Sequence, residues 1–235
     1  MVSPVTVEGL PSSAVQASTC GLAVFDLDRT MLRGSSLARF GRAVVERGLV
    51  SRRVVRRHLV REAVFTARGL GTATLERLAV SLLELVSGQE HAPLAGLAGE
   101  VGGLLADETY PGARWLLQRH QAAGDLCVLV SAAPQDLVDA VGRALGFHRT
   151  VGTVAEVESG RFTGRLASVL CHGDGKLVRL QEALGEVAFH AATAYGDSGS
   201  DVPLLGACRH PVAVNPDRHL RAVAATRHWP IIRFA

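Results

Sequence analysis

The sequence predicts an α/β fold in which a doubly wound parallel sheet carries an inserted all-helical cap. Short apolar runs rich in β-branched residues alternate along the chain with segments of helical periodicity, as in strands joined by crossover helices. Each apolar run stops on a polar turn, as buried parallel strands do at their carboxyl ends. From residue 37 to residue 106 the pattern changes, because leucines recur at helical spacing and no strand pattern interrupts them. This stretch predicts the cap.

The apolar runs and the helical periodicity together predict the individual strands and helices. Apolar runs predict strands at 21–27, 126–130, 191–195 and 211–214. Helical patterns lie between and after them, at 114–123, 136–145, 176–184, 202–207 and 218–226. Short alternating runs spaced by glycines predict that 151–166 leaves the sheet as a β-hairpin. The expected organisation is a loose N-terminal extension at 1–19, a core made of 20–34 and 107–235, and a helical cap at 35–106.

Composition excludes several classes of protein. The chain has 235 residues, of which 48% are hydrophobic and 20% charged, which is typical of a globular protein and not of a disordered one. Its apolar stretches fall short of the roughly 20 residues that a membrane helix needs. The first 25 residues contain no Lys or Arg and include Glu8, so they lack the basic start of a secretory signal. We therefore expect a cytoplasmic protein with no stable insertion into a membrane.

The cysteines and the basic residues indicate which kinds of site the chain can contain. The four cysteines show neither paired spacing nor a companion histidine pattern, so we expect reduced thiols without a structural metal. Of the 25 basic residues 24 are Arg, and Lys176 is the only lysine. A chain that uses Arg elsewhere has reason to keep a compact ammonium at one place. The Arg-rich run 52–61 predicts an amphipathic cap helix with a solvated face, in preference to a nucleic-acid site.

Polar side chains follow the predicted strands. They are Asp26, Asp28, Ser131, Asp197 and Asp201. In open α/β sheets ligands bind beyond the carboxyl ends of the strands, so these groups are expected to meet there. Four crowded carboxylates repel one another unless a cation neutralises them, and oxygen-only ligation suits Mg²⁺. With Lys176 as a positive partner for an anionic substrate, this combination indicates a phosphoryl-transfer centre.

The polar residues at the predicted strand ends resemble the motifs of a known family. The segment Asp26-Leu27-Asp28-Arg29-Thr30, then Ser131, Lys176 and the segment 196–201 (GDSGSD) resemble, in order and spacing, the four motifs of haloacid dehalogenase-like phosphatases. The resemblance extends from about Cys20 to Phe234 and implies a Rossmann-like core. The insertion between the first two motifs is similar to the helical cap of the phosphoserine-phosphatase-like branch.

The resemblance implies a role for each carboxylate. Asp26 would attack phosphorus and become an aspartyl-phosphate. Asp28 would protonate the leaving alkoxide and then activate the water that cleaves the intermediate. Mg²⁺ would be held by the Asp26 carboxylate, the backbone carbonyl of Asp28 and Asp197. Asp201 would lie beside the metal or pair with Lys176.

The remaining motif residues would handle the phosphate. Ser131 and the amides that follow it, beginning with Ala132, would bind the phosphate oxygens. Lys176 would neutralise charge on the transferring group, and Thr30 would orient the loop of the first motif. Asp28 also distinguishes between reactions, because an alkoxide leaving group needs an acid and the dehalogenase relatives do not. A phosphatase is therefore favoured over a dehalogenase.

The substrate is expected to be a small organic phosphate monoester other than phosphoserine. Ser35 stands where phosphoserine phosphatases carry a Glu for the substrate ammonium, and Ser200 stands where they carry an Asn. Their cap arginine aligns with Ala79, although Arg77 is near. Four alternatives remain open: a phosphoserine phosphatase, a non-catalytic phosphate-binding or regulatory module, a nucleic-acid binder, and an enzyme that transfers phosphate to an alcohol instead of water.

Overall fold

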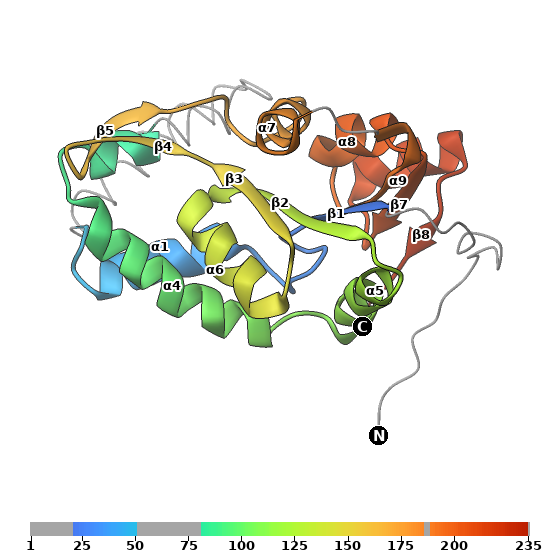
Figure 1. The fold of residues 1–235 in the computed structure, drawn as a ribbon, viewed down its shortest axis with the longest axis horizontal. Coiled ribbons are helices and arrows are strands. Elements are labelled where there is room, and N and C mark those ends of the chain that lie inside the picture. The colour runs from blue at the N-terminus through green and yellow to red at the C-terminus, as the bar shows by residue number, and fades with distance from the viewer. Residues whose placement is uncertain (1–20, 51–80, 186–188, 235) are drawn as a thin grey trace.

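A six-stranded parallel sheet forms the centre of the molecule (Figure 1). The computed structural model describes residues 21–50, 81–185 and 189–234. The strands follow one another in the order β3-β2-β1-β6-β7-β8, and every neighbouring pair is parallel. Their bounds are Leu22–Asp26 (β1), Leu126–Pro134 (β2), Arg149–Thr153 (β3), Thr193–Gly196 (β6), His210–Val214 (β7) and Ile231–Ile232 (β8).

Helices cover both faces of the sheet. Phe25 belongs to an apolar cluster on one face with Leu129, whereas its neighbour Val24 packs on the other face with Leu180. Both side chains are at most 1% exposed. Burying each of them stabilises the folded state by about 1.5–3 kcal/mol. The first face carries α5 (Pro111–Ala122) and α6 (Gln135–Leu145); the second carries α7 (Gly175–Leu184), α8 (Val202–Ala207) and α9 (Arg218–Arg227). The predicted doubly wound sheet is confirmed.

Three details of the sheet differ from the prediction. Residues 149–153 form β3 at one edge of the sheet, so the hairpin is confined to β4 (Ala155–Glu158) and β5 (Arg161–Leu166). An edge strand and a hairpin strand show the same short alternation, which explains the misplaced boundary. The strand predicted to end at Val130 continues to Pro134, with a register shift against β3. The two-residue strand β8 is too short to leave a periodic signal.

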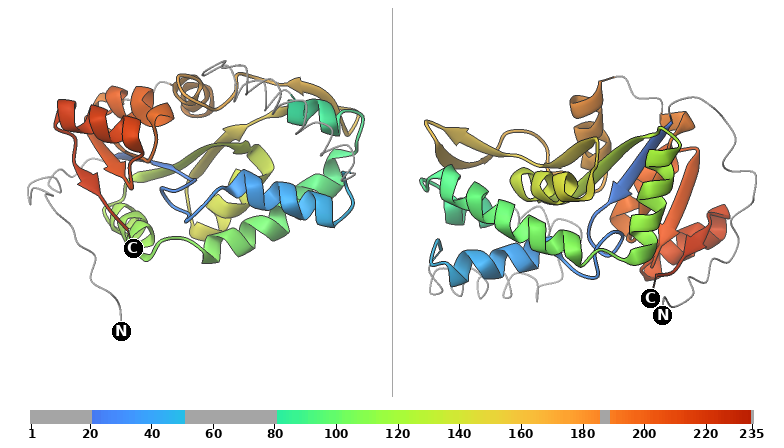
Figure 2. Two further views of the ribbon diagram at one scale, coloured as in Figure 1. Left: turned by 180° about the vertical axis from the view of Figure 1, so that it is seen from behind. Right: turned by 60° about the horizontal axis from the view of Figure 1, so that its bottom comes forward.

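The described part of the insertion contains two long helices. Helices α1 (Ser36–Glu46) and α4 (His91–Asp107) lie side by side, and α4 also packs on α6 of the core (Figure 2). A Cβ at Gly102 of α4 would lie 2.4 Å from the Cβ of Ala140, so the two helices touch through this glycine. The backbone of Phe162 accepts a hydrogen bond from Gly88 (2.7 Å) and donates one to Gln89 (3.0 Å). Helix α4 and the hairpin thereby link this region to the core.

Some predictions fall outside the described residues. These are the N-terminal extension 1–19, the Arg-rich run 52–61, and the positions of Arg77 and Ala79. The three cysteines that are described are buried and free. A search of the described ranges finds no helix with the length and apolar character needed to cross a membrane.

Candidate active site

Three adjacent strands bring the predicted polar residues to one edge of the sheet. Asp26 is the last residue of β1 and lies opposite Val130 of β2, while Phe25 lies opposite Tyr195 of β6. Ser131 and Asp197 come shortly after those partners. The register of the sheet, set by its apolar faces, therefore fixes how Asp26, Ser131 and Asp197 approach one another.

Lys176 joins two of the acids. It lies in the first turn of α7, and its Nζ donates hydrogen bonds to Oδ1 of Asp26 and to Oδ1 of Asp201, each at 2.5 Å. The exposed fractions are 2% for Lys176, 5% for Asp26 and 0% for Asp201. A buried ammonium with two carboxylate partners uses the compact head group that distinguishes Lys from Arg. The only lysine of the chain thus lies at the centre of the acidic cluster.

The electrostatics of the cluster show an excess of negative charge. Burial raises the pKa of Asp26 well above its usual value, and the attraction of Lys176 offsets this only in part. Burial followed by repulsion from Asp201 raises the pKa of Asp197 to about 7. For Asp201 burial acts in the same direction, but Lys176 outweighs it, and the pKa of Asp201 falls below its usual value. The pKa of Lys176 is raised, because its two carboxylates outweigh its burial. Three buried carboxylates face one buried ammonium and the exposed guanidinium of Arg29, and the remaining negative charge favours the entry of a cation.

The donor atoms fit a hard divalent ion. Asp26, Asp197 and Asp201 each offer one carboxylate oxygen, and these oxygens lie within 4.8 Å of one another. Oδ2 of Asp197 is buried and accepts no hydrogen bond from the described residues, although Nε of Arg29 forms an ion pair with it at 2.7 Å. Oxygen-only donors of this kind suit Mg²⁺.

Asp201 also holds the loop that follows β6. Its Oδ2 accepts hydrogen bonds from the backbone of Asp197 (3.1 Å) and from the backbone and hydroxyl of Ser198 (3.0 and 3.1 Å). The short 3₁₀ helix η2 (Gly199–Asp201) carries it back over the strand end. A Cβ at Gly196 would lie 2.6 Å from the Cβ of Asp201. Glycine at 196 is therefore what allows the Asp201 carboxylate to reach Lys176.

We expect Gly196→Ala to lower the phosphatase activity that the motifs imply, measured as kcat/KM on an aryl phosphate, by about 10²-fold, because a shift of about 1 Å in a positioned group is enough for a loss of this size. Gly99→Ala is the matched control, since a Cβ at Gly99 meets no atom within 4 Å. Steady-state kinetics with both variants checks the expectation. Equal activity of the two variants would contradict the role given to Gly196.

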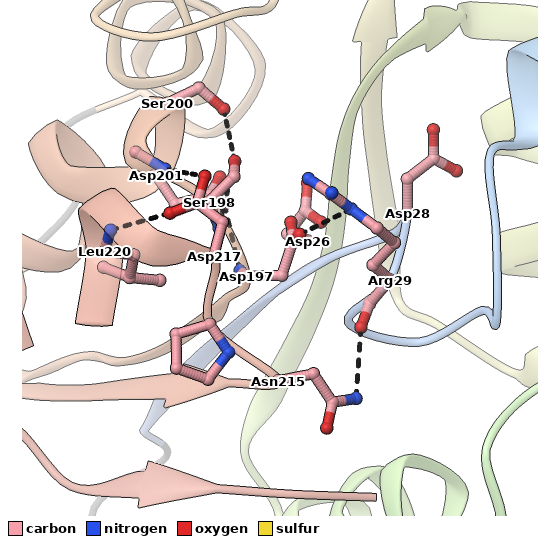
Figure 3. Close-up of polar contacts among 12 residues, drawn as sticks. Asp26, Asp28, Arg29, Asp197, Ser198, Ser200, Asp201, Asn215, Asp217 and Leu220 are labelled. Atoms are coloured by element: carbon pink, nitrogen blue, oxygen red, sulfur yellow. Dashed lines mark hydrogen bonds and ion pairs between the residues drawn. The ribbon is translucent and has the colours of Figure 1, made fainter.

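In Figure 3 Asp28 lies on the other side of Arg29 from Asp197. Its Oδ1 accepts a hydrogen bond from the backbone N–H of Ser36 at 2.8 Å. Burial raises the pKa of the Asp28 carboxyl, and the hydrogen bond from Ser36 opposes this rise. Its side chain is not part of the group of three oxygens above. Burial thus shifts the pKa of this carboxyl in the direction that a proton donor needs.

The other motif residues differ in their surroundings. Ser131 is buried, and its hydroxyl accepts a hydrogen bond from the backbone N–H of Ala133 at 3.1 Å. Ala132 is exposed, and its carbonyl accepts one from the hydroxyl of Thr153 at 2.8 Å. The hydroxyl of Thr30 is buried and makes no hydrogen bond with a described residue. The loop after β1 closes instead through its backbone, where the carbonyl of Leu27 accepts from Met31 and Leu32.

Sequence reasoning did not single out three residues of this site. Arg29 adopts a left-handed conformation (φ 61°), forms the ion pair with Asp197, and its carbonyl accepts from Nδ2 of Asn215 at 3.4 Å. Asp217 donates from its backbone to the carbonyl of Asp197 (2.8 Å) and accepts from the backbone of Gly199 (3.1 Å). Figure 3 shows Asp217 beside the loop after β6 and the contact between Asn215 and the carbonyl of Arg29. Asn215 and Asp217 could have been found from the sequence, because they also follow an apolar run that predicts a strand.

Comparison with known proteins places these motifs in a family. The model of the haloacid dehalogenase-like hydrolases matches residues 23–206. A phosphoserine phosphatase of Mycobacterium tuberculosis is 37% identical over 219 residues, which cover 90% of this chain and 70% of that protein. A histidinol-phosphatase of Neisseria meningitidis serogroup C is 28% identical over 91% of this chain and 98% of its own length.

The fold has a solved relative of similar size. The crystal structure of a protein with unknown function from Bordetella pertussis Tohama I is 32% identical, with a TM-score of 0.78, and the match covers 91% of this chain and 98% of that one. The family model, these identities and the shared fold show that the chain belongs to the haloacid dehalogenase-like hydrolase family.

Proposed function

We propose that this protein is a Mg²⁺-dependent phosphatase that hydrolyses a small organic phosphate monoester through an aspartyl-phosphate on Asp26. Membership of the hydrolase family and the phosphatase names of its relatives support the general activity. The observation that carries the detailed proposal is the buried contact between Lys176 and Asp26, 2.5 Å long, at an acidic strand edge. The ammonium of Lys176 holds the carboxylate of Asp26 in place and carries the positive charge that a bound phosphate would need.

In the first step a carboxylate oxygen of Asp26 attacks phosphorus, and the bond from phosphorus to the ester oxygen breaks. Lys176 fixes the side chain of Asp26 through Oδ1 and neutralises part of the charge that develops on the transferring group. Asp28 gives its proton to the leaving oxygen. The raised pKa of Asp28 supports this role, because an acid must hold a proton before it can donate one.

In the second step a water molecule attacks the phosphorus of the aspartyl-phosphate. Asp28, now ionised, takes a proton from this water, and Asp26 leaves as a carboxylate. Ser131 and the amide of Ala132 would hold the phosphate oxygens, and Thr30 would keep the first-motif loop in place. Asp201 acts through others, since it positions Lys176 and the loop that carries Asp197.

Magnesium would be held by the carboxylates of Asp26 and Asp197 and by the backbone carbonyl of Asp28, with Asp201 beside them. When bound it supplies charge neutralisation between the nucleophile and the phosphate. The excess of buried carboxylates over ammonium groups supports this assignment.

We expect Mg²⁺ to stabilise the metal-depleted protein. At about 100 times its dissociation constant the ion should raise the free energy of unfolding by about 2.7 kcal/mol. For a domain of this size that corresponds to a rise in Tm of about 5–10 °C. Asp197→Asn should lose most of this rise, whereas the control Asp107→Asn, an exposed acid at the end of α4, should keep it. Equal shifts in both variants would contradict the metal assignment.

The residue at position 35 argues against phosphoserine as the substrate. The hydroxyl of Ser35 accepts a hydrogen bond from the backbone of Ala38 (3.3 Å) and so caps α1. It offers no negative charge to a substrate ammonium where phosphoserine phosphatases carry a Glu. Phosphoserine remains in the test because a relative carries its name.

The decisive experiment is a screen of the purified protein with Mg²⁺ against organic monophosphates, including an aryl phosphate, phosphoserine and histidinol phosphate. Release of inorganic phosphate from at least one of them, absent in Asp26→Asn, would support the proposal. Binding of phosphate without turnover of any compound would favour the non-catalytic module instead. Adding an acceptor alcohol and analysing the products separates hydrolysis from phosphate transfer.

A further inference from the structure

We infer that the leaving group of the substrate is an apolar chain that lies in a cavity beside the phosphate site, so that the substrate is an alkyl or comparable hydrophobic phosphate monoester. This inference rests on the proposed function and adds the substrate class. The cavity has a volume of about 860 Å³. Sites for small molecules commonly range from about 300 to 1,000 Å³, so there is room for a chain.

The cavity begins where a leaving group would be released. Ala132, which directly follows the phosphate-binding candidate Ser131, forms part of its lining. Leu37 also lines it, and Leu37 follows Ser36, whose backbone N–H holds the carboxyl of Asp28. Asp28 and Ser131 are not among the described lining residues, but Ala132, whose amide is a proposed phosphate ligand, is one of them. A group bonded to the ester oxygen would extend into the cavity.

The walls of the cavity are apolar. Helix α1 contributes Phe40 and Val44, residues 82–86 contribute three leucines and Val86, and the hairpin contributes Val157 and Phe162. Of the 24 described lining residues 19 are apolar or glycine, and none is Lys or Arg. A substrate carboxylate would find no Lys or Arg among these residues, and the one acid, Asp136, already lies 2.9 Å from Nε2 of His91.

The polar side chains of the lining are already engaged. They are His91, Gln135, Asp136, Thr153 and His172. Nε2 of His91 lies 2.9 Å from Oδ2 of Asp136, and Gln135 accepts a hydrogen bond from the backbone of Gly152 at 2.6 Å. Thr153 donates to the carbonyl of Ala132, and His172 also has a partner within the protein. These polar side chains already contact other residues of the protein. Apolar contact is therefore the main source of affinity for the leaving group.

A series of n-alkyl monophosphates tests the inference. With ethyl, butyl, hexyl and octyl phosphate below their micellar concentrations, kcat/KM should rise about fourfold per methylene group until the chain fills the cavity. The aryl phosphate serves as the generic substrate. If it is hydrolysed while the alkyl series shows no dependence on chain length, the inference is wrong and the proposed function stands. If nothing is hydrolysed, both fail.

A filled cavity provides the second measurement. Gly41 of α1 lines the cavity, and a Cβ there meets no atom within 4 Å, so Gly41→Leu should fold and occupy the space. Gly103→Leu is the matched control, because Gly103 is a helical glycine of α4 with the same freedom and is not in the described lining.

We expect Gly41→Leu to lower kcat/KM for octyl phosphate at least tenfold and to change that for ethyl phosphate less than twofold. Gly103→Leu should change neither, and circular dichroism should show that both variants fold. Binding of octylphosphonate to Asp26→Asn, followed by calorimetry, should give a negative heat-capacity change that Gly41→Leu diminishes. Equal losses on both substrates in Gly41→Leu, or preference of the wild type for phosphoserine over octyl phosphate, would overturn the inference.

Discussion

Asp26→Asn should reduce turnover of an aryl phosphate by at least about 10³-fold while the fold remains intact. The amide has the same shape as the carboxylate, but its oxygen is a poor nucleophile and cannot form the aspartyl-phosphate. Its oxygen can still accept the hydrogen bond that Lys176 Nζ now gives to Oδ1. The substitution also removes one charge from a cluster in which burial already raises the pKa of Asp26. Thermal unfolding of the metal-free variant should therefore show no loss of stability relative to the metal-free wild type.

The measurement is kcat with saturating Mg²⁺, accompanied by a melting curve of the same protein without the metal. Asp107→Asn is again the control, since this exposed acid at the end of α4 should keep the rate of the wild type. A residual rate above about one hundredth of the wild type in Asp26→Asn would show that another group attacks phosphorus.

The sheet and the convergence of the acids could be predicted because burial on two faces leaves a simple signature. Val24 and Phe25 point to opposite faces and both must be apolar, so the strand is a continuous apolar run that ends abruptly at Asp26. Parallel strands place such ends at one edge. The pairing of Asp201 with Lys176 was one of two alternatives, and the structure contains this contact.

What could not be predicted depends on contacts between segments distant in the sequence. Arg29 reaches Asp197 from a left-handed conformation that arginine rarely adopts, so no propensity points to it. Asp217 supports the loop after β6 only because β7 lies next to β6. The cavity likewise combines Leu37 with Val157, which are joined by the packing of the hairpin and not by any local pattern.

Asp28→Asn should affect substrates according to their leaving group. An alkoxide must be protonated as it departs, so an alkyl phosphate should lose about 10³-fold in kcat/KM. A nitrophenolate leaves readily without an acid, so nitrophenyl phosphate should lose at most about tenfold in its first step. The backbone N–H of Ser36 can donate to the amide oxygen of the substituted side chain as it does to Oδ1 of Asp28, so the loop should keep its place.

The second step should slow as well, because the same residue activates the attacking water. With nitrophenyl phosphate we therefore expect a burst of nitrophenol, followed by slow turnover and an accumulated phosphoenzyme that mass spectrometry locates on Asp26. The control is again Asp107→Asn, which should show neither burst nor loss. Equal losses on the alkyl and nitrophenyl substrates without a burst would mean that Asp28 does not move the proton. The cavity would then still accept the leaving group, but its departure would need a different acid. Lys176, the ammonium beside Asp26, is a poor candidate for that role, because its raised pKa opposes the loss of a proton.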